Sequence, residues 1–184
     1  RMENEFLAWL TKEGDEVVTV EAAISKYIKL AQIQAGFIYD NEGGIRHLVP
    51  EEKNTRLNTL VGFVDDELVG KAIIVYNHKP VKDQLLKALS PFGQLAFIHG
   101  GMTTAEIEAE KARFNDDPHV RFICITKAAK YGHTLLGDQS SPETACSTMI
   151  FYENTYSADD RSQLEDRAHR HGQRAAGVAQ HAAA

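Results

Sequence analysis

Two segments in the first half of the chain repeat apolar residues with the period of an amphipathic α-helix. The first begins at Thr19, which can cap a helix, and ends at Gly36, which favours a helix end. The second begins at Pro50, followed by two glutamates favoured in a first turn, and ends before Gly70. The repeated apolar positions are Ile24, Tyr27, Ile28 and Ala31, then Leu57, Leu60, Val61, Val64 and Leu68. Each pattern predicts a helix with one buried face.

The next part of the chain contains short apolar runs without clean alternation between apolar and polar residues. These runs are residues 72–76, 95–98, 122–125 and 149–152. Helical stretches lie between or after them, at residues 81–89, 104–114 and 158–170. Runs without alternation are typical of strands covered on both faces, and strands that alternate with helices favour a parallel sheet. The pattern therefore predicts an α/β sandwich, with residues 137–147 as a polar surface loop.

The composition is that of a single folded domain. The chain has 184 residues, of which 43% are hydrophobic and 25% are charged. No apolar run approaches the roughly 18 residues that span a bilayer, and the N-terminus lacks a signal pattern, so we expect a cytoplasmic protein without a membrane partner. The net charge of −6 argues against strong binding of nucleic acid by this chain alone, because phosphates are neutralised by Lys and Arg. Any contact with DNA should be local.

The cysteines and histidines form neither a disulfide framework nor a metal-binding pattern. Cys124 and Cys146 lie in no C-x-x-C or Cys/His zinc spacing, so we expect two free thiols. His169 and His171 are too close together for the usual zinc-helix spacing. His99, His119 and His133 have no cysteine partners in a zinc-binding spacing. We therefore expect surface or packed histidines and no metal site.

The run QLEDRAHRHGQ, residues 163–173, is the most informative stretch for function. On a helix, Gln163, Arg167 and Arg170 are at positions i, i+4 and i+7, so they project from one face. Gly172 can end this helix and leave the arginines near the rim of the domain. Arginine is suited to that position because its planar fork binds phosphate oxygens in a bidentate manner. The spacing alone favours a solvated helix face with an Asp166–Arg170 pair.

QLEDRAHRHGQ resembles the sixth motif of Swi/Snf-type DNA translocases of helicase superfamily two. The resemblance implies that Arg167 and Arg170 are arginine fingers that reach the γ-phosphate of ATP across a lobe interface, with Gln163 near the ATP cleft. It also implies the fold, a RecA-like three-layer sandwich around a central, mostly parallel sheet.

Two upstream segments resemble further motifs of the same family, in the family's order. KAIIVYNHK, residues 71–79, is similar to the fourth motif, a buried strand that delivers polar residues, here Asn77 and His78, at its carboxyl end. HGGMTTAEIEAEKARFN, residues 99–115, is similar to the Asp-Gly-Ser-Thr segment and the helix after it.

The glycine turn of this second segment is a candidate anion site. Thr103 and Glu106 have capping-box spacing, and Gly100 and Gly101 let backbone approach a ligand closely. A glycine turn that opens a helix can bind an anion, and in the family it meets a DNA backbone phosphate. By itself, the turn is also consistent with a simple strand-to-helix connection.

ITKAAKYGHTLLG, residues 125–137, is similar to the family's fifth motif. The resemblance implies that Thr126 and Lys127 face DNA phosphate and that Gly132 lies close to the ATP cleft. The segment also departs from the family pattern. Ala129 and Lys130 replace two glycines, and His133 and Thr134 replace an apolar residue and an asparagine. The role of the missing asparagine is therefore not transferred, and Lys130 is either an added phosphate contact or a solvated lysine.

The resemblance extends over most of the chain. ISKYIKLAQIQAGFIYD, residues 24–40, is similar to the leader that precedes this lobe in compact phage and bacterial members. We expect residues 1–40 to form a helical leader that packs on the lobe and residues 41–173 to form a helicase C-terminal RecA-like domain. Residues 174–184 are Ala-rich, and we expect a disordered tail, a linker or an artificial extension.

The missing motifs limit what this chain can do by itself. It contains no G-x-x-x-x-G-K-S/T phosphate loop and no Asp-Glu-x-His metal motif, so ATP and Mg²⁺ should be held by a first RecA-like lobe. We expect a second motor lobe of an ATP-dependent DNA translocase, which is inactive alone and whose partners are the first lobe and the backbone of double-stranded DNA. The alternative is a non-catalytic nucleic-acid or protein interaction module with relic motor motifs. An unrelated nucleotide-binding enzyme would need a phosphate loop.

Overall fold

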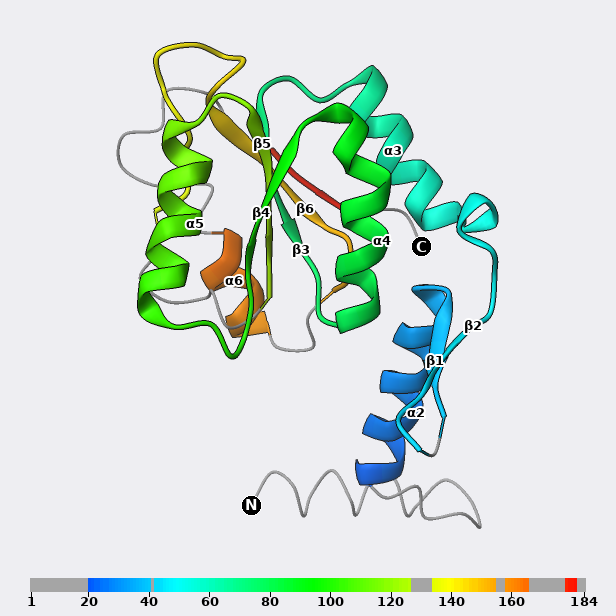
Figure 1. Ribbon diagram of the computed structural model, residues 1–184. Coiled ribbons are helices and arrows are strands. Elements are labelled where there is room, and N and C mark those ends of the chain that lie inside the picture. The colour runs from blue at the N-terminus through cyan, green and yellow to red at the C-terminus, as the bar shows by residue number, and fades with distance from the viewer. Residues whose placement is uncertain (1–19, 41, 127–133, 155–157, 166–177, 182–184) are drawn as a thin grey trace. The chain divides into compact units, whose positions relative to one another are not determined.

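The computed structural model describes residues 20–40, 42–126, 134–154, 158–165 and 178–181 (Figure 1). The chain divides into two compact units, Arg1–Leu48 and Val49–Ala184. The predicted boundary between leader and lobe, at residues 40 and 41, falls inside the first of these units. Among the described residues, no helix has the length and apolar character that crossing a membrane requires.

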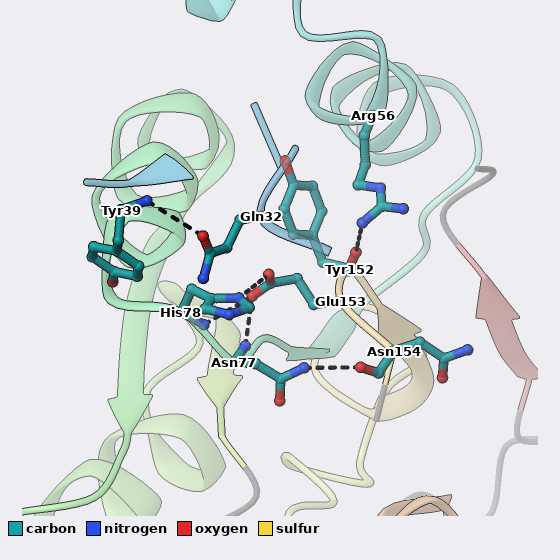
Figure 2. Close-up of polar contacts among 8 residues, drawn as sticks. All are labelled: Gln32, Tyr39, Arg56, Asn77, His78, Tyr152, Glu153 and Asn154. Carbon is teal, nitrogen blue, oxygen red and sulfur yellow. Dashed lines mark hydrogen bonds and ion pairs between the residues drawn. The ribbon is translucent and has the colours of Figure 1, made fainter. Parts of the chain in front are cut away.

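The first unit contains one helix and a β-hairpin. Helix α2 (Val20–Gln34) is followed by strands β1 (Phe37–Tyr39) and β2 (Ile45–His47), which pair antiparallel. The main-chain N–H of Tyr39 donates to Oε1 of Gln32 at 3.3 Å, which ties β1 to the helix (Figure 2). The side chains of Tyr27 and Ile28 are 45% and 37% exposed. The helix is therefore confirmed, but these two residues of its predicted buried face are not buried.

The second unit is built on a five-stranded sheet with the order β4-β5-β3-β6-β7, in which every neighbouring pair is parallel. The strands are β3 (Lys71–Val75), β4 (Gln94–Ile98), β5 (Val120–Ile125), β6 (Cys146–Phe151) and β7 (Val178–His181). The first four correspond to the four predicted apolar runs. Strand β7 lies within residues 174–184, where the sequence pattern predicts no strand, and it pairs with β6.

The helices of the second unit complete a three-layer sandwich. They are η1 (Glu51–Lys53), α3 (Thr55–Asp66), α4 (Lys79–Leu89), η2 (Ser90–Phe92), α5 (Thr104–Asp116) and α6 (Ala158–Glu165). Phe114 of α5 and Leu164 of α6 belong to the same core cluster as Ile73 of β3, so both helices cover one face of the sheet. Figure 1 shows α3 and α4 on the other side of the sheet. The predicted RecA-like three-layer fold with a parallel sheet is confirmed.

The start of α3 differs from the predicted helix start at Pro50. Residues Glu51–Lys53 form a separate 3₁₀ turn, and α3 begins at Thr55. The reason is Asn54, whose Oδ1 accepts the main-chain N–H of Leu57 at 3.2 Å and so caps the helix. An asparagine cap inside the predicted helix therefore divides it into two elements.

The central strand β3 carries the core. All five of its residues are buried, and Ile73 is fully enclosed between β5 and β6, opposite Ile123 and Met149. This burial explains why the run has no polar alternation. Enclosing one such side chain contributes about 1.5–3 kcal/mol to folding.

The amino ends of the strands are closed by side chains that bind main-chain carbonyl groups. Lys71 is 1% exposed, and its Nζ donates to the carbonyl oxygens of Phe114, at the end of α5, and of Asp117, the latter at 2.8 Å. Burial lowers the pKa of Lys71. Arg121 donates from Nε to the carbonyl oxygen of Gly70 at 3.1 Å and from Nη2 to that of Leu68 at 2.6 Å. Both cations at this edge therefore bind their own domain.

Candidate functional site

The carboxyl ends of four parallel strands meet at one edge of the sheet, and the described candidate residues from the fourth, fifth and glycine-turn motifs follow them. Asn77 and His78 come after β3, Gly100 and Gly101 after β4, and Thr126 after β5. Main-chain hydrogen bonds continue the sheet into these loops. They run from Tyr76 N to Ile125 O at 3.0 Å, from Thr126 N to Ile98 O at 3.0 Å and from Glu153 N to Val75 O at 3.1 Å. The edge is therefore an ordered extension of the sheet.

Glu153, directly after β6, organises the loop after β3. Glu153 is 2% exposed, and its Oε2 accepts the main-chain N–H groups of Asn77 at 2.6 Å and of His78 at 2.9 Å (Figure 2). Its Oε1 lies 2.6 Å from Nδ1 of His78. Because a carboxylate accepts, Nδ1 carries the proton, and the imidazole is held with Nε2 turned away from Glu153. Hydrogen-bond donors stabilise a buried carboxylate, and Glu153 has three of them. Glu153 therefore fixes both the backbone and the ring of His78.

The amide of Asn77 makes a second link between the same two loops. Its Nδ2 donates to the carbonyl oxygen of Asn154 at 2.9 Å (Figure 2). Arg56 of α3 donates from Nη1 to the carbonyl oxygen of Tyr152 at 3.1 Å, and its guanidinium lies 5.9 Å from the Tyr152 ring centroid. Burial raises the pKa of Tyr152 to about 12, so this phenol stays neutral. The side chain of Asn77 thus links the loop after β3 to the loop after β6.

Glu153 was not among the predicted site residues. The signal in the sequence is an acidic residue directly after an apolar run, in FYEN, residues 151–154. The same position relative to its strand is what marked Asn77 and His78. The contact itself joins residues 75 or more positions apart in the chain. It depends on β6 lying next to β3, which local periodicity does not specify.

The turn after β4 has the predicted capping box. Glu106 Oε2 accepts the N–H of Thr103 at 2.7 Å and its hydroxyl at 2.9 Å, and Thr103 Oγ1 accepts the N–H of Glu106 at 3.3 Å. These hydrogen bonds from Thr103 lower the pKa of Glu106. Gly101 has a φ of +92°, which favours glycine, and an added Cβ on Gly100 or Gly101 would meet no atom within 4 Å. The main chain of this turn is therefore open to a ligand.

Only part of the predicted ATP-cleft set falls within the described residues. Gln163 lies in α6, and its Oε1 is buried without a hydrogen-bond partner among the described residues. Nearby in sequence, Arg161 donates from Nη1 to Asn154 Oδ1 at 3.1 Å, and its guanidinium lies 4.6 Å from the ring centroid of Phe151. The remaining predicted site residues lie outside the described residues: Gly132, Lys127, Arg167 and Arg170. Their roles stay predictions.

The two cysteines are free and buried, in β5 and β6. Burial raises the pKa of both thiols, to about 12 for Cys146. Neither is therefore a ready nucleophile near neutral pH. Within the part of the chain that the structure describes, no three His, Cys, Asp or Glu side chains are grouped so that they could hold a metal ion.

Comparison with known proteins agrees with this geometry. The fold and its polar carboxyl edge define a RecA-like helicase lobe. A model of the helicase conserved C-terminal domain matches residues 52–172. Since the match covers more than half of the chain, the chain belongs to this helicase C-terminal domain family. No curated protein sequence matches the chain.

Solved structures share the fold at low sequence identity. The C-terminal part of the Fun30 ATPase domain superimposes with a TM-score of 0.56 at 22% identity, over 68% of this chain and 38% of that one. The C-terminal domain of the DEAD-box protein Dbp5 gives 0.54 at 18% identity, over 70% and 69%. S. cerevisiae Dbp5 bound to RNA and ADP BeF3 gives 0.51 at 18% identity, over 68% and 31%. The chain thus spans well under half the length of the Fun30 structure and of RNA-bound Dbp5.

Proposed function

We propose that this chain is the second motor lobe of a Swi/Snf-type, ATP-dependent DNA translocase of superfamily two. The observation that carries the proposal is the common edge at which β3, β4 and β5 deliver Asn77, His78, Gly100, Gly101 and Thr126. The residues come from three segments that resemble successive family motifs. Membership in the helicase C-terminal domain family supports the same assignment.

In this proposal, ATP and Mg²⁺ are held by a first RecA-like lobe. Binding of ATP draws the two lobes together, and Arg167 and Arg170 stabilise the charge that develops on the γ-phosphate. Gln163 and Gly132 lie beside the nucleotide. Because the arginines reach the phosphate only when the cleft is closed, closure is coupled to hydrolysis. The isolated chain is inactive because it contains no phosphate loop.

The carboxyl edge holds backbone phosphates of double-stranded DNA in the same proposal. The turn offers the main chain of Gly100 and Gly101, while His78, Thr126 and Lys127 offer side chains. Phosphate contacts position a protein on DNA without reading sequence, so the motor tracks along any sequence. Alternate closing and opening of the lobes then moves the edge along the backbone. The net charge of −6 is consistent with local contacts that are weak without the first lobe.

The test uses the chain joined to the first lobe of its motor. We expect Arg170→Ala to reduce DNA-stimulated ATP hydrolysis by about 10³- to 10⁵-fold, the usual effect of an arginine finger, while ATP binding survives. The matched control is Arg113→Ala, which removes an exposed arginine paired with Glu110 at 2.6 Å. Turnover retained in Arg170→Ala would refute the arginine-finger assignment.

The second candidate function is a non-catalytic interaction module. The departures from the fifth motif favour it, since Ala129 and Lys130 stand where the family has two glycines. The same joined protein discriminates between the two functions. The interaction module is the correct function if the joined protein binds ATP and DNA, DNA does not stimulate ATP hydrolysis, and Arg170→Ala leaves the hydrolysis rate unchanged.

A further inference from the structure

Two basic side chains from different elements meet beside the glycine turn. Lys82 lies on α4, and His99 directly follows β4. The Nζ atom of Lys82 is 3.4 Å from Nε2 of His99. Lys82 belongs to none of the segments that resemble family motifs, and neither residue is among the predicted DNA contacts.

The hydrogen bonds of His99 indicate the tautomer of its ring and therefore which nitrogen can accept from Lys82. Nδ1 of His99 is 3.0 Å from the carbonyl oxygen of Gly100. A carbonyl oxygen only accepts, so Nδ1 carries the proton. In the neutral ring, Nε2 is then an acceptor, and the ammonium group of Lys82 donates to it. His99 therefore couples the position of Lys82 to the backbone of the turn.

The ammonium group of Lys82 also lies beside an aromatic ring. Its Nζ lies 5.0 Å from the ring centroid of Phe97 in β4, within the range of a cation–π contact. The residue is half-buried rather than a fully extended surface lysine. An ammonium group held by a ring and an imidazole has lost rotamer freedom before any ligand binds, which lowers the cost of binding.

Lys82 differs in its partners from Lys87 and Lys111, which both pair with a carboxylate. Lys87, further along α4, pairs with Glu51 at 2.5 Å, and Lys111 pairs with Glu108 at 2.8 Å. Within the described part of the chain, no carboxylate oxygen lies within 4.0 Å of Lys82 Nζ. Glu106, the acidic residue of the turn, already accepts hydrogen bonds from Thr103. The positive charge of Lys82 is therefore not neutralised within the described residues.

The ligand that fits this arrangement is a phosphate group. The turn leaves open space beside Gly100 and Gly101, so an anion can approach the main chain. Lysine supplies a compact point charge with rotatable donors, which suits a single phosphate oxygen.

We propose that Lys82, positioned by His99, binds a backbone phosphodiester of duplex nucleic acid at the Gly100–Gly101 turn. The inference rests on the proposed function, because it adds a cation to the DNA-binding edge. Lys82 contacts the phosphate directly. His99 acts through Lys82 and is a positioning residue.

The salt dependence of DNA binding tests the direct contact. The full 184-residue chain is titrated against duplex DNA at several low salt concentrations, and log Kobs is plotted against log salt concentration. Each phosphate contact contributes a slope of about −0.9, so Lys82→Met should reduce the steepness by about 0.9 and weaken binding. Methionine keeps the apolar stem on Phe97. Lys87→Met removes the same charge from the same helix and should leave the slope nearly unchanged.

The possible outcomes separate this inference from the proposed function. If the unchanged chain shows no salt-dependent binding to DNA, both fall. If it binds and Lys82→Met has the slope of Lys87→Met, only the Lys82 assignment is overturned. Thermal unfolding by circular dichroism verifies that each variant is folded. Repeating the titration with duplex RNA identifies the source of the phosphate: a slope change with DNA alone assigns it to DNA, and an equal change assigns it to either backbone.

A double-mutant cycle tests the positioning role of His99. His99→Ala should weaken DNA binding less than Lys82→Met does, and adding His99→Ala to Lys82→Met should weaken it no further. Additive effects of the two substitutions would overturn the positioning role, because they would mean that His99 acts independently of Lys82.

Discussion

Charged side chains have different partners at the amino ends and at the carboxyl ends of the parallel strands. At the amino edge, Lys71 and Arg121 donate to main-chain carbonyl oxygens of their own domain. At the carboxyl edge, Glu153 collects donors from the loop after β3, and Lys82 faces an imidazole without a carboxylate. The amino edge is closed by its own chain, whereas the carboxyl edge orders its loops and leaves main-chain groups open. Ligands of open α/β sheets bind at the carboxyl ends of the strands. In this chain the difference between a closed amino edge and an open carboxyl edge is a physical reason for that preference.

The glycines show the same contrast. Gly70, at the amino edge, has a φ of +76°, and an added Cβ would lie 2.4 Å from the carbonyl oxygen of Pro142. Gly100 and Gly101, at the carboxyl edge, have open space where a Cβ would be. Backbone packs against the first glycine, so it serves folding. The other two leave room for a ligand.

Gly70→Ala should have the largest effect on stability. The left-handed backbone costs about 1–2 kcal/mol for a residue with a Cβ, and the clash with Pro142 adds about 1–3 kcal/mol. Chemical denaturation should therefore show a loss of about 3 kcal/mol. The matched variant Gly100→Ala, which meets no atom within 4 Å, should change the free energy of unfolding by less than about 1 kcal/mol. Equal losses in the two variants would contradict the contrast between the edges.

Lys71→Met should have the next largest effect. The substitution keeps an apolar stem beside Phe114 but leaves two carbonyl oxygens, of Phe114 and Asp117, without their donor. A buried acceptor without a partner costs about 1–3 kcal/mol, so we expect a loss of about 2 kcal/mol in urea unfolding. Lys87→Met, which removes one partner of an exposed ion pair, should change the free energy of unfolding far less than Lys71→Met does.

The same residue predicts a pH dependence. Burial lowers the pKa of Lys71 in the folded state below its ordinary value of 10.5, so the unfolded chain binds more protons between the two pKa values. The contribution of Lys71 to stability should therefore rise with pH through this window. The difference in unfolding free energy between the unchanged chain and Lys71→Met, measured from pH 7 to pH 10.5, should grow. A difference that shrinks would show that burial does not dominate at this site.

Glu153→Gln should have a smaller effect on stability and a specific effect on the edge. The carboxylate of Glu153 accepts through two oxygens, from two main-chain N–H groups and from Nδ1 of His78. Glutamine has only one acceptor oxygen, so it cannot accept all three hydrogen bonds. We expect a loss of about 1.5 kcal/mol, the lower end for hydrogen bonds to a charged group. NMR of the imidazole should show a changed tautomer or orientation of His78. The exposed control Glu52→Gln should leave both the free energy of unfolding and the imidazole signals of His78 unchanged.

The central strands and the main helices could be predicted from the sequence, but the short strands β1, β2 and β7 could not. The strands β3 to β6 are apolar runs buried on both faces, a pattern with a direct cause in packing. Strands β1 and β2 have three residues each, too few to show a period, and all of β2 is exposed. Strand β7, VAQH, lies in an Ala-rich segment and is defined by pairing with β6.

The candidate site divides in the same way. The capping box of Thr103 and Glu106 depends on residues three apart, and local spacing predicts it. The contacts of Glu153 with His78, and of Lys82 with His99, join different elements. Their existence depends on the order of strands in the sheet and on where α4 lies. Sequence spacing specifies neither the strand order nor the position of α4. The contacts of Glu153 and Lys82 are therefore seen only in the folded structure.

Mapping duplex DNA on the isotopically labelled chain by amide NMR tests the central claim most directly. We predict that, at low salt, the largest shift changes fall on the loops after β3, β4 and β5, around residues 77–78, 99–103 and 126, while the amides of Lys71 and Arg121 stay in place. Changes centred on Lys71 and Arg121, or the absence of any change at the carboxyl edge, would contradict the claim that this edge binds nucleic acid.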